Sequence, residues 1–334
     1  MKRLCLFFIL ILTISSLLFA TGARQQARPG DGRINVTSLT FPSYDFVRAI
    51  AGDRVNLSLL TSPGMESHSF EPSPRDIIAI RNSDLFIYPG GQGSLWMDRV
   101  LESAGIVGSH NIAGSGPRIL RLIDIVEALE EEFVEGMEVY HGYELQREHD
   151  HHHDHHDDPE LDEHVWTSPR NAILIVSALA EVLSELDGGN ADFYRENARV
   201  YIAQLREIDA AFQAVLDGAR RNTILVGDRF PFRYLAFHYG FNYYAAFSGC
   251  STDTEPSAAT VAFLINQVRM LQLPVVFHIE LSTERIADTI SEATGARKLL
   301  LHSGHNLSMR DFNTGLTYLD IQRSNVENLR AALW

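Results

Sequence analysis

Several histidines and acids follow short apolar runs in this sequence, at the points where strands are predicted to end. They are His68 after the run 55–60, Asp228 after 223–226, Glu280 after 275–279, and His302 and His305 after 298–301. In open parallel sheets, ligands bind beyond the carboxyl ends of the strands, so one cleft between two lobes would collect these side chains. His164, between an acidic stretch and a predicted helix, would join them. Imidazoles with one or two carboxylates suit Zn²⁺, and Mn²⁺ where carboxylates dominate.

Each of these residues also has an ordinary structural role open to it. Asp228 can pair with Arg229, and Glu280 can be a favourably placed acid at a helix N-terminus. A single histidine is more often a surface or hydrogen-bonding residue than a ligand. Only the coincidence of several candidates at strand ends indicates a metal site.

A histidine-rich tract lies inside the polar, acidic stretch 127–162. It consists of His149, Asp150, His151, His152, His153, Asp154, His155 and His156. A packed helix or strand there would bury many charges, so we interpret the stretch as a mobile loop. Such a tract binds transition metals weakly and in several geometries, because nothing fixes its angles. It therefore indicates a collector or sensor of metal rather than a tight site.

Apolar runs alternate with helical patterns on both sides of this loop. The predicted strands are 34–40, 55–60, 85–88, 223–226, 275–279 and 298–301, and the predicted helices are 43–51, 73–81, 94–103, 168–186, 191–216, 232–239, 257–271, 282–294 and 317–333. Strands separated by helices imply parallel sheets. We therefore expect an α/β fold of two lobes, each with a mostly parallel sheet flanked by helices, joined by a long rigid helix, with the metal site in the interlobe cleft.

The expected domain organisation follows from these elements and from the start of the chain. Lys2 and Arg3 precede the apolar run 4–20, and the small residues 20–23 follow it, which is typical of a secretory signal. We divide the chain into a signal peptide at 1–23, an N-terminal lobe at 33–167 that includes the loop 127–162, a helical connection at 168–218 and a C-terminal lobe at 219–334. The sequence leaves cleavage of the leader open.

The apolar run and the positions of the cysteines together indicate the compartment of the protein. The run 4–20 is short for a membrane span, and no cysteine follows it where bacterial lipid attachment would need one. We expect a soluble periplasmic or otherwise extracytoplasmic protein. After cleavage Cys250 would be the only thiol, and we expect it to be a half-buried small residue.

Charge and missing motifs exclude other classes of protein. Asp and Glu total 43 against 28 Lys and Arg, a formal charge of −15, which argues against nucleic acid or anionic lipid as the main partner. The sequence has no His-Glu-x-x-His helix, no phosphate-binding P-loop and no Gly-x-Ser-x-Gly elbow. We therefore expect a binding protein and not an enzyme.

Two segments carry a family resemblance. Gly64-Met65-Glu66-Ser67-His68-Ser69-Phe70-Glu71-Pro72-Ser73-Pro74-Arg75-Asp76 and Asp162-Glu163-His164-Val165-Trp166-Thr167-Ser168-Pro169 resemble the first and second ligand segments of the zinc- and manganese-binding proteins of bacterial ABC importers, the ZnuA- and TroA-like cluster. The order of elements, the lobes, the histidine-rich loop and the linking helix are similar too. The resemblance thus covers essentially the whole chain after the leader.

The resemblance implies a set of ligands. His68 and His164 correspond to the ligands of the N-terminal lobe. The third ligand position falls on Arg229, which cannot ligate a cation, so Asp228 is expected in its place. His302 is the favoured equivalent of the fourth ligand, with His305 as runner-up, and Glu280 resembles an acid that supports the ligands from behind.

The function implied is capture of Zn²⁺, or of Mn²⁺, and its delivery to an ABC permease by a monomer that binds no nucleic acid. Carboxylate ligands would favour Mn²⁺, whereas the histidine-rich loop favours Zn²⁺. Neutral imidazoles hold the ion, so affinity should fall as the pH drops through about 6.5. A metal-dependent adhesin or a periplasmic metal buffer would use the same site, and a zinc hydrolase is the less favoured alternative.

Overall fold

The computed structural model describes residues 32–65, 70–106, 116–137, 160–251 and 255–334. Contacts divide the chain into two units, Met1–Arg33 and Ile34–Trp334, and all elements below belong to the second unit. The leader, His68 and the histidine-rich tract lie outside the described residues. Among the helices that are described, none is both long enough and apolar enough to cross a membrane.

Two four-stranded sheets form the framework, and every pairing within them is parallel. Their strand orders are β2-β1-β3-β4 and β6-β5-β7-β8. The strands are β1 Asn35–Ser38, β2 Asn56–Leu59, β3 Leu85–Tyr88, β4 Arg118–Arg121, β5 Thr223–Phe230, β6 Asn242–Ser248, β7 Val275–His278 and β8 Arg297–Leu300. The predicted α/β class with two parallel sheets is confirmed.

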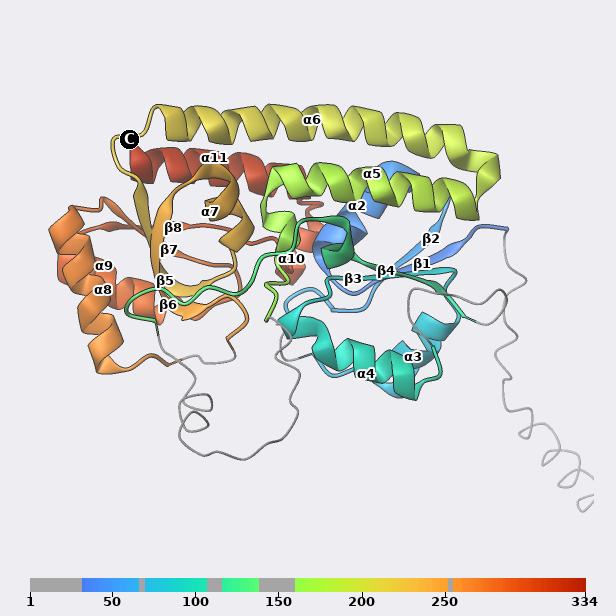
Figure 1. Cartoon of the computed structure of the whole chain (residues 1–334), viewed down its shortest axis with the longest axis horizontal. Coiled ribbons are helices and arrows are strands. Elements are labelled where there is room, and N and C mark those ends of the chain that lie inside the picture. The colour runs from blue at the N-terminus through green and yellow to red at the C-terminus, as the bar shows by residue number, and fades with distance from the viewer. Residues whose placement is uncertain (1–31, 66–69, 107–115, 138–159, 252–254) are drawn as a thin grey trace, which may run out of the picture. The chain divides into compact units, whose positions relative to one another are not determined.

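Helices connect the strands and cover the sheets (Figure 1). The α-helices are α2 Phe41–Ala51, α3 Pro74–Arg81, α4 Leu95–Ser103, α5 Pro169–Leu186, α6 Ala191–Asp217, α7 Arg233–Tyr239, α8 Ala258–Leu271, α9 Arg285–Thr294, α10 Met309–Asn313 and α11 Tyr318–Leu333, and the short 3₁₀ helices include η2 Gln92–Ser94, η3 Leu122–Ile125, η5 Val165–Thr167 and η6 Gly188–Asn190. The predicted starts at 73 and 257 are confirmed, since Ser73 and Asp76 form a capping box and Ser257 caps α8, whereas α2 begins two residues before the predicted 43 and α9 three residues after the predicted 282.

The long helix α6 spans both halves of this unit, the N-terminal half built on β1–β4 and the C-terminal half built on β5–β8. Its 27 residues reach about 40 Å at 1.5 Å per residue. It packs against α5 and α2 of the N-terminal half and against α11 and α7 of the C-terminal half, as Figure 1 shows for α5 and α11. A helix that packs on elements of both halves holds their sheets in one arrangement.

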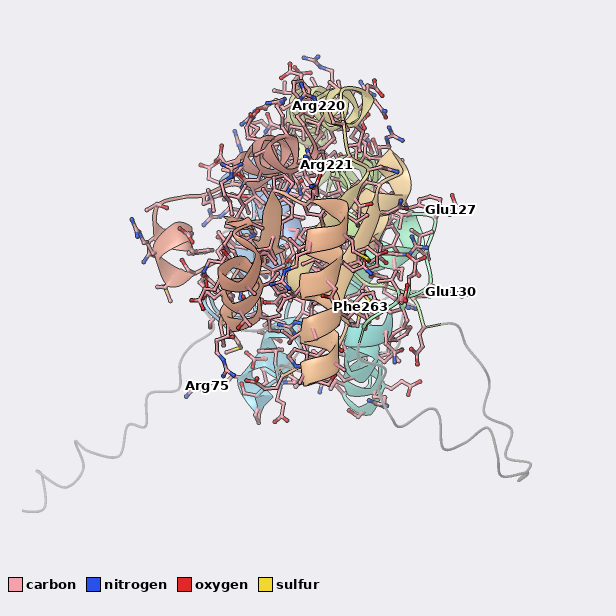
Figure 2. The ribbon with its side chains drawn as sticks, turned by 90° about the vertical axis from the view of Figure 1, so that its left-hand side faces the viewer. Arg75, Glu127, Glu130, Arg220, Arg221 and Phe263 are labelled. Atoms are coloured by element: carbon pink, nitrogen blue, oxygen red, sulfur yellow. The ribbon has the colours of Figure 1, made fainter. Side chains whose placement is uncertain are left out.

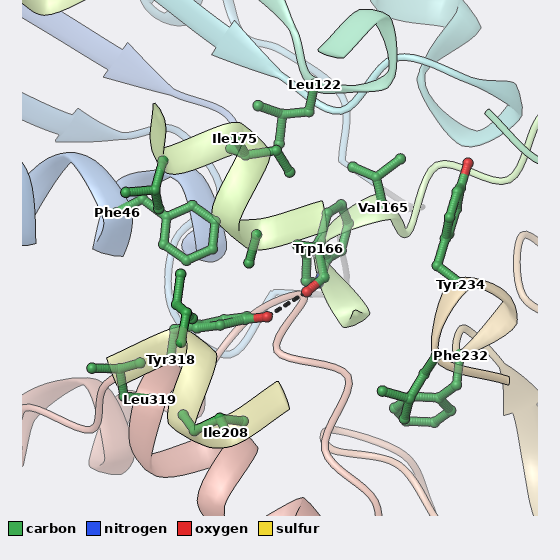
Figure 3. Packing of buried hydrophobic residues seen from close by; sticks show 14 of the residues in the cluster. Phe46, Leu122, Val165, Trp166, Ile175, Ile208, Phe232, Tyr234, Tyr318 and Leu319 are labelled. Carbon is green, nitrogen blue, oxygen red and sulfur yellow. Dashed lines mark hydrogen bonds between the residues drawn. The ribbon is translucent and has the colours of Figure 1, made fainter. Parts of the chain in front are cut away.

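A continuous hydrophobic core runs between the halves beneath α6. In Figure 3, Trp166 of η5 lies between Phe46 of α2, Tyr318 of α11 and Phe232. The Tyr318 hydroxyl donates to the Trp166 carbonyl at 2.5 Å. Burying large aromatic side chains is strongly stabilising, so this core fixes the segment that carries His164.

The described residues at the two ends of the acidic stretch 127–162 lie side by side and hydrogen-bond to each other. Glu130 and Leu161 make an antiparallel bridge, and the Asp162 amide donates to the Leu129 carbonyl at 2.9 Å. Glu127 and Glu130 are exposed and extend from the outer edge of this segment (Figure 2). The bridge brings Glu131 beside Asp162, two residues before His164.

Candidate metal centre

His164 is fixed by its neighbours in the chain. It lies just before η5 and is 1% exposed. Oδ1 of Asp162 accepts from the His164 backbone N–H at 2.7 Å and lies 3.0 Å from its Nδ1. A carboxylate that accepts the Nδ1 proton sets the tautomer and orients the ring, which leaves Nε2 as the donor atom for a metal.

The Glu163 side chain extends toward the turn after β3, where glycines leave space for it. Its Oε2 accepts from the Ser94 hydroxyl at 2.6 Å. A Cβ at Gly93 would lie 2.6 Å from the Glu163 carboxyl carbon, and one at Gly91 would lie 2.8 Å from the Leu161 carbonyl oxygen. The glycine-rich turn after β3 therefore makes room for this carboxylate.

His305 comes from the loop between β8 and α10. Its backbone N–H donates to Oε1 of Glu280 and to the Ser303 hydroxyl, each at 3.1 Å. The Trp166 indole N–H donates to the Ser303 carbonyl at 2.9 Å, and the Trp166 and His305 rings lie 5.0 Å apart. Glu280 and Trp166 together hold the loop that presents His305.

Glu163, His164 and His305 form a group that could hold a metal ion. All three are buried, and one donor atom from each lies within 4.8 Å of the others. The two imidazole rings are 5.3 Å apart and nearly perpendicular, and Oε1 of Glu163 lies 3.8 Å from Nε2 of His305. Ligands of tetrahedral zinc are about 3.3 Å apart, since each bond is about 2.0 Å. The donors are of the types that zinc prefers, and they would have to draw closer together to reach this spacing.

A pocket opens beside this group and is lined from both halves. Its lining comprises Met65, His164, Arg229, Pro231, Gly249, Ile279, Glu280, Leu281, Ser303, His305 and Asn306. The lining combines two imidazoles, a carboxylate and a guanidinium.

Carboxylates dominate the electrostatics around His164. Burial lowers the pKa of His164, but Asp162, Glu163 and Glu131 more than offset it and raise the pKa to about 9. Burial and the Asp162 carboxylate raise the pKa of Glu131 to about 7, so this acid holds a proton near neutral pH. In the metal-free protein, the imidazole of His164 is therefore a cation over most of the neutral range. The pH range for proton competition lies above the expected 6.5.

Two predicted ligands lie outside this group. Nδ1 of His302 accepts from the Gly304 N–H at 2.9 Å, and its backbone pairs with the side chain of Asn325. Oδ1 of Asp228 accepts from the Arg229 N–H at 2.8 Å, and the Ser282 side chain also bonds to Asp228. His302, after β8, and Asp228, within β5, thus have hydrogen-bonding roles, and the runner-up His305 is the residue near His164.

Arg229 and Cys250 lie next to the site, but neither side chain is suited to bind a cation. The Arg229 guanidinium lies in the pocket lining, with Nε 4.0 Å from Oδ1 of Asp228 and Nη1 donating to the Ser251 carbonyl at 3.3 Å. Cys250 is half-buried, as predicted. Burial and the nearby carboxylates raise the pKa of its thiol well above the ordinary value, and a protonated thiol is a poor ligand.

Sequence reasoning missed Glu163 as a donor. It stood in a run of acids beside His164, where a solvated charge is the usual expectation. The available signal was the turn Gly90-Gly91-Gln92-Gly93, whose glycines leave space for a side chain from elsewhere.

Two parallel sheets, a helix that spans them and buried imidazoles from both halves define the architecture of metal-binding solute-binding proteins. Residues 36–332 match the family model of zinc-uptake complex component A, described as periplasmic. The chain belongs to this ZnuA family.

Curated relatives and solved structures agree with this assignment. The chain is 28% identical over 321 residues to the zinc-binding lipoprotein AdcA of Streptococcus pneumoniae, covering 96% of this chain and 60% of that protein. It is 29% identical over 301 residues to the high-affinity zinc uptake system protein ZnuA of Bacillus subtilis, covering 90% and 88%. The chain spans about 60% of the length of the curated relatives it matches first.

The crystal structure of the Zn(II)-bound ZnuA-like domain of AdcA from Streptococcus pneumoniae superposes with a TM-score of 0.71. It is 25% identical and covers 90% of this chain and 99% of that one. The match supports the fold and the arrangement of the two sheets.

Proposed function

We propose that this chain is an extracytoplasmic receptor that captures Zn²⁺ and delivers it to an ABC permease. The observation that carries the proposal is the buried group of Glu163, His164 and His305, with one histidine from each half of the fold. Membership of the zinc-uptake family and the zinc-binding relatives support the same cargo. Two imidazoles with one carboxylate favour Zn²⁺ over Mn²⁺, which prefers oxygen ligands.

The proposed ligand set joins geometry and resemblance. Glu163, His164 and His305 follow from their proximity, and His68 is retained from the resemblance of its segment. His305 replaces His302, whose Nδ1 already accepts a hydrogen bond. Asp228 is left out, because its carboxylate is not part of the group formed by Glu163, His164 and His305.

Calorimetry on metal-free protein tests the site. Zn²⁺ should bind one tight site, and His164→Ala or His305→Ala should each weaken it at least tenfold. His278→Ala is the matched control, because His278 lies on β7 outside the pocket lining. His302→Ala separates the two candidates: wild-type affinity supports His305, whereas a tenfold loss there with none for His305→Ala would return the ligand role to His302.

The remaining parts of the proposal concern processing and partners. The segment 1–23 acts as a signal peptide, and the lobes 33–167 and 219–334 act with the helical connection 168–218 as a monomer that catalyses no reaction and binds no nucleic acid. The loop 127–162 collects further metal, so deleting residues 148–158 should lower the zinc stoichiometry and leave the tight site. Uptake of radioactive zinc by cells that express the chain with a permease and its ATPase tests delivery. Uptake that is unchanged when the chain is removed contradicts it.

A further inference from the structure

Asn306 connects two loops that come from opposite halves of the fold. It follows His305 directly, and the residue is 2% exposed. Its Nδ2 donates to the carbonyl oxygens of Ser62 and Met65, each at 2.9 Å. Both hydrogens of the side-chain amide are therefore used on the loop that follows β2.

Backbone contacts complete the same junction. The Gly64 N–H donates to the Leu307 carbonyl at 2.6 Å, and Oδ1 of Asn306 accepts from the Leu307 N–H at 2.8 Å. Gly64 has a φ of +85°, a conformation that side-chain-bearing residues rarely adopt. Residues 62–65 are thus fastened to residues 306–307 by hydrogen bonds that run between the halves.

This junction is part of the pocket wall. Met65, His305 and Asn306 all line the pocket beside the metal group. Met65 is 38% exposed, so it stands where the pocket meets solvent. Separating the two loops would withdraw Met65 and, in the same movement, release the residue next to His305.

We propose that Asn306 is a positioning residue that keeps the pocket closed around bound Zn²⁺. Asn306 is not a ligand of the ion. It acts by holding the loop 62–65 and the neighbouring His305 in place. Without its amide, the carbonyl oxygens of Ser62 and Met65 lose their donor, and because both residues are exposed, water replaces the amide and favours an open, hydrated arrangement. The inference rests on the proposed function. Losing the Asn306 hydrogen bonds should increase the rate at which zinc dissociates.

The sharpest test replaces Asn306 by Asp. The two side chains have the same shape, but a carboxylate offers no hydrogen to the Ser62 and Met65 carbonyls. Its negative charge beside a cation would by itself slow zinc release. Stopped-flow mixing of zinc-loaded protein with excess chelator should nevertheless show dissociation at least tenfold faster for Asn306→Asp and Asn306→Ala. The Co²⁺ absorption spectrum should match that of the wild type, because the ligands are unchanged.

Further variants separate this role from simple destabilisation. Asn306→Gln keeps the amide and should release zinc at a rate closer to wild type than Asn306→Asp does. Asn306→Ser keeps one hydrogen-bond donor, so its zinc dissociation rate should be intermediate. This variant tests the proposal if the other changes prevent folding. Asn197→Ala, which removes a 2.9 Å bond from α6 to the Ile50 carbonyl, should release zinc at the wild-type rate.

The outcomes distinguish the two proposals. If the wild-type protein binds no Zn²⁺, the proposed function fails. If the wild type binds zinc tightly and the Asn306 variants release it at the wild-type rate, only the positioning role is overturned. A changed Co²⁺ spectrum for Asn306→Ala also overturns it, since Asn306 itself would then touch the ion in the wild type.

Discussion

Zinc binding to this protein should be a proton-exchange reaction, because the metal and a proton compete for His164. Burial lowers the pKa of this imidazole, but Asp162, Glu163 and Glu131 raise it to about 9 in the metal-free protein. Only the neutral ring can hold a cation. Below pH 9, binding must therefore expel about one proton from this residue.

The size of the effect follows from the pKa. The fraction of neutral imidazole rises about 25-fold between pH 7.0 and 8.5 for a pKa near 9, and only about 1.3-fold for an ordinary pKa of 6.5. The apparent zinc affinity should rise by the same factor, since each zinc ion displaces that proton. A steep rise above pH 7 is thus a signature of the carboxylates around His164.

A competition titration against a chelator of known pH dependence measures the profile. Calorimetry in two buffers of different ionisation enthalpy counts the protons released. Asp162→Asn removes the largest contribution that raises the pKa, so its profile should flatten above pH 7.5. His278→Ala should keep the wild-type slope. A wild-type affinity that is flat between pH 7.0 and 8.5 refutes the electrostatic reasoning.

Three further predictions follow from the same residues. Because the pKa of His164 is raised, the stability it contributes is present below pH 6.5 and is lost as the pH rises through about 9; urea unfolding of metal-free protein should show a loss of about 3 kcal/mol over that range. Gly93→Ala pushes a methyl group against the Glu163 carboxylate and should weaken zinc binding about tenfold with little change in melting temperature; Gly188→Ala, with nothing within 4 Å, should bind normally. Arg229→His removes a cation and adds a donor, so calorimetry should show tighter binding, and weaker binding would mean that the guanidinium only supports the fold.

Most of the fold could be predicted because its central strands are apolar and its helices carry explicit start signals. β3, Leu85–Tyr88, is buried throughout and was predicted with its observed bounds. The two strands that were missed, β4 and β6, both lie at sheet edges. β4 is Arg-Ile-Leu-Arg, with little apolar signal, and β6 follows α7 with almost no loop. β6 is mostly buried, but its run Asn-Tyr-Tyr-Ala-Ala-Phe-Ser shows no alternation that would separate it from the end of α7.

The site was only partly predictable, because proximity depends on loops that no local pattern describes. The rule that ligands follow strands placed His302 and His305 near one another but could not choose between them. The choice depends on the turn at Gly304, whose φ is +75° and whose amide donates to His302. Glu163 can join the two histidines because the turn at Gly93 leaves space for its carboxylate, and no pattern next to Glu163 in the sequence signals that space.

The two histidines of the site are held by different kinds of interaction, and this difference indicates where metal exchange begins. His164 precedes the fully buried Trp166, which lies in the core shared by α2, α5 and α11. Moving it would disturb packed aromatic side chains, which is costly. His305 lies on a loop held mainly by hydrogen bonds to Glu280 and by the junction at Asn306, and such bonds exchange readily with water. Release of zinc should therefore start on the His305 side, with His164 and its carboxylates staying in place to receive the next ion.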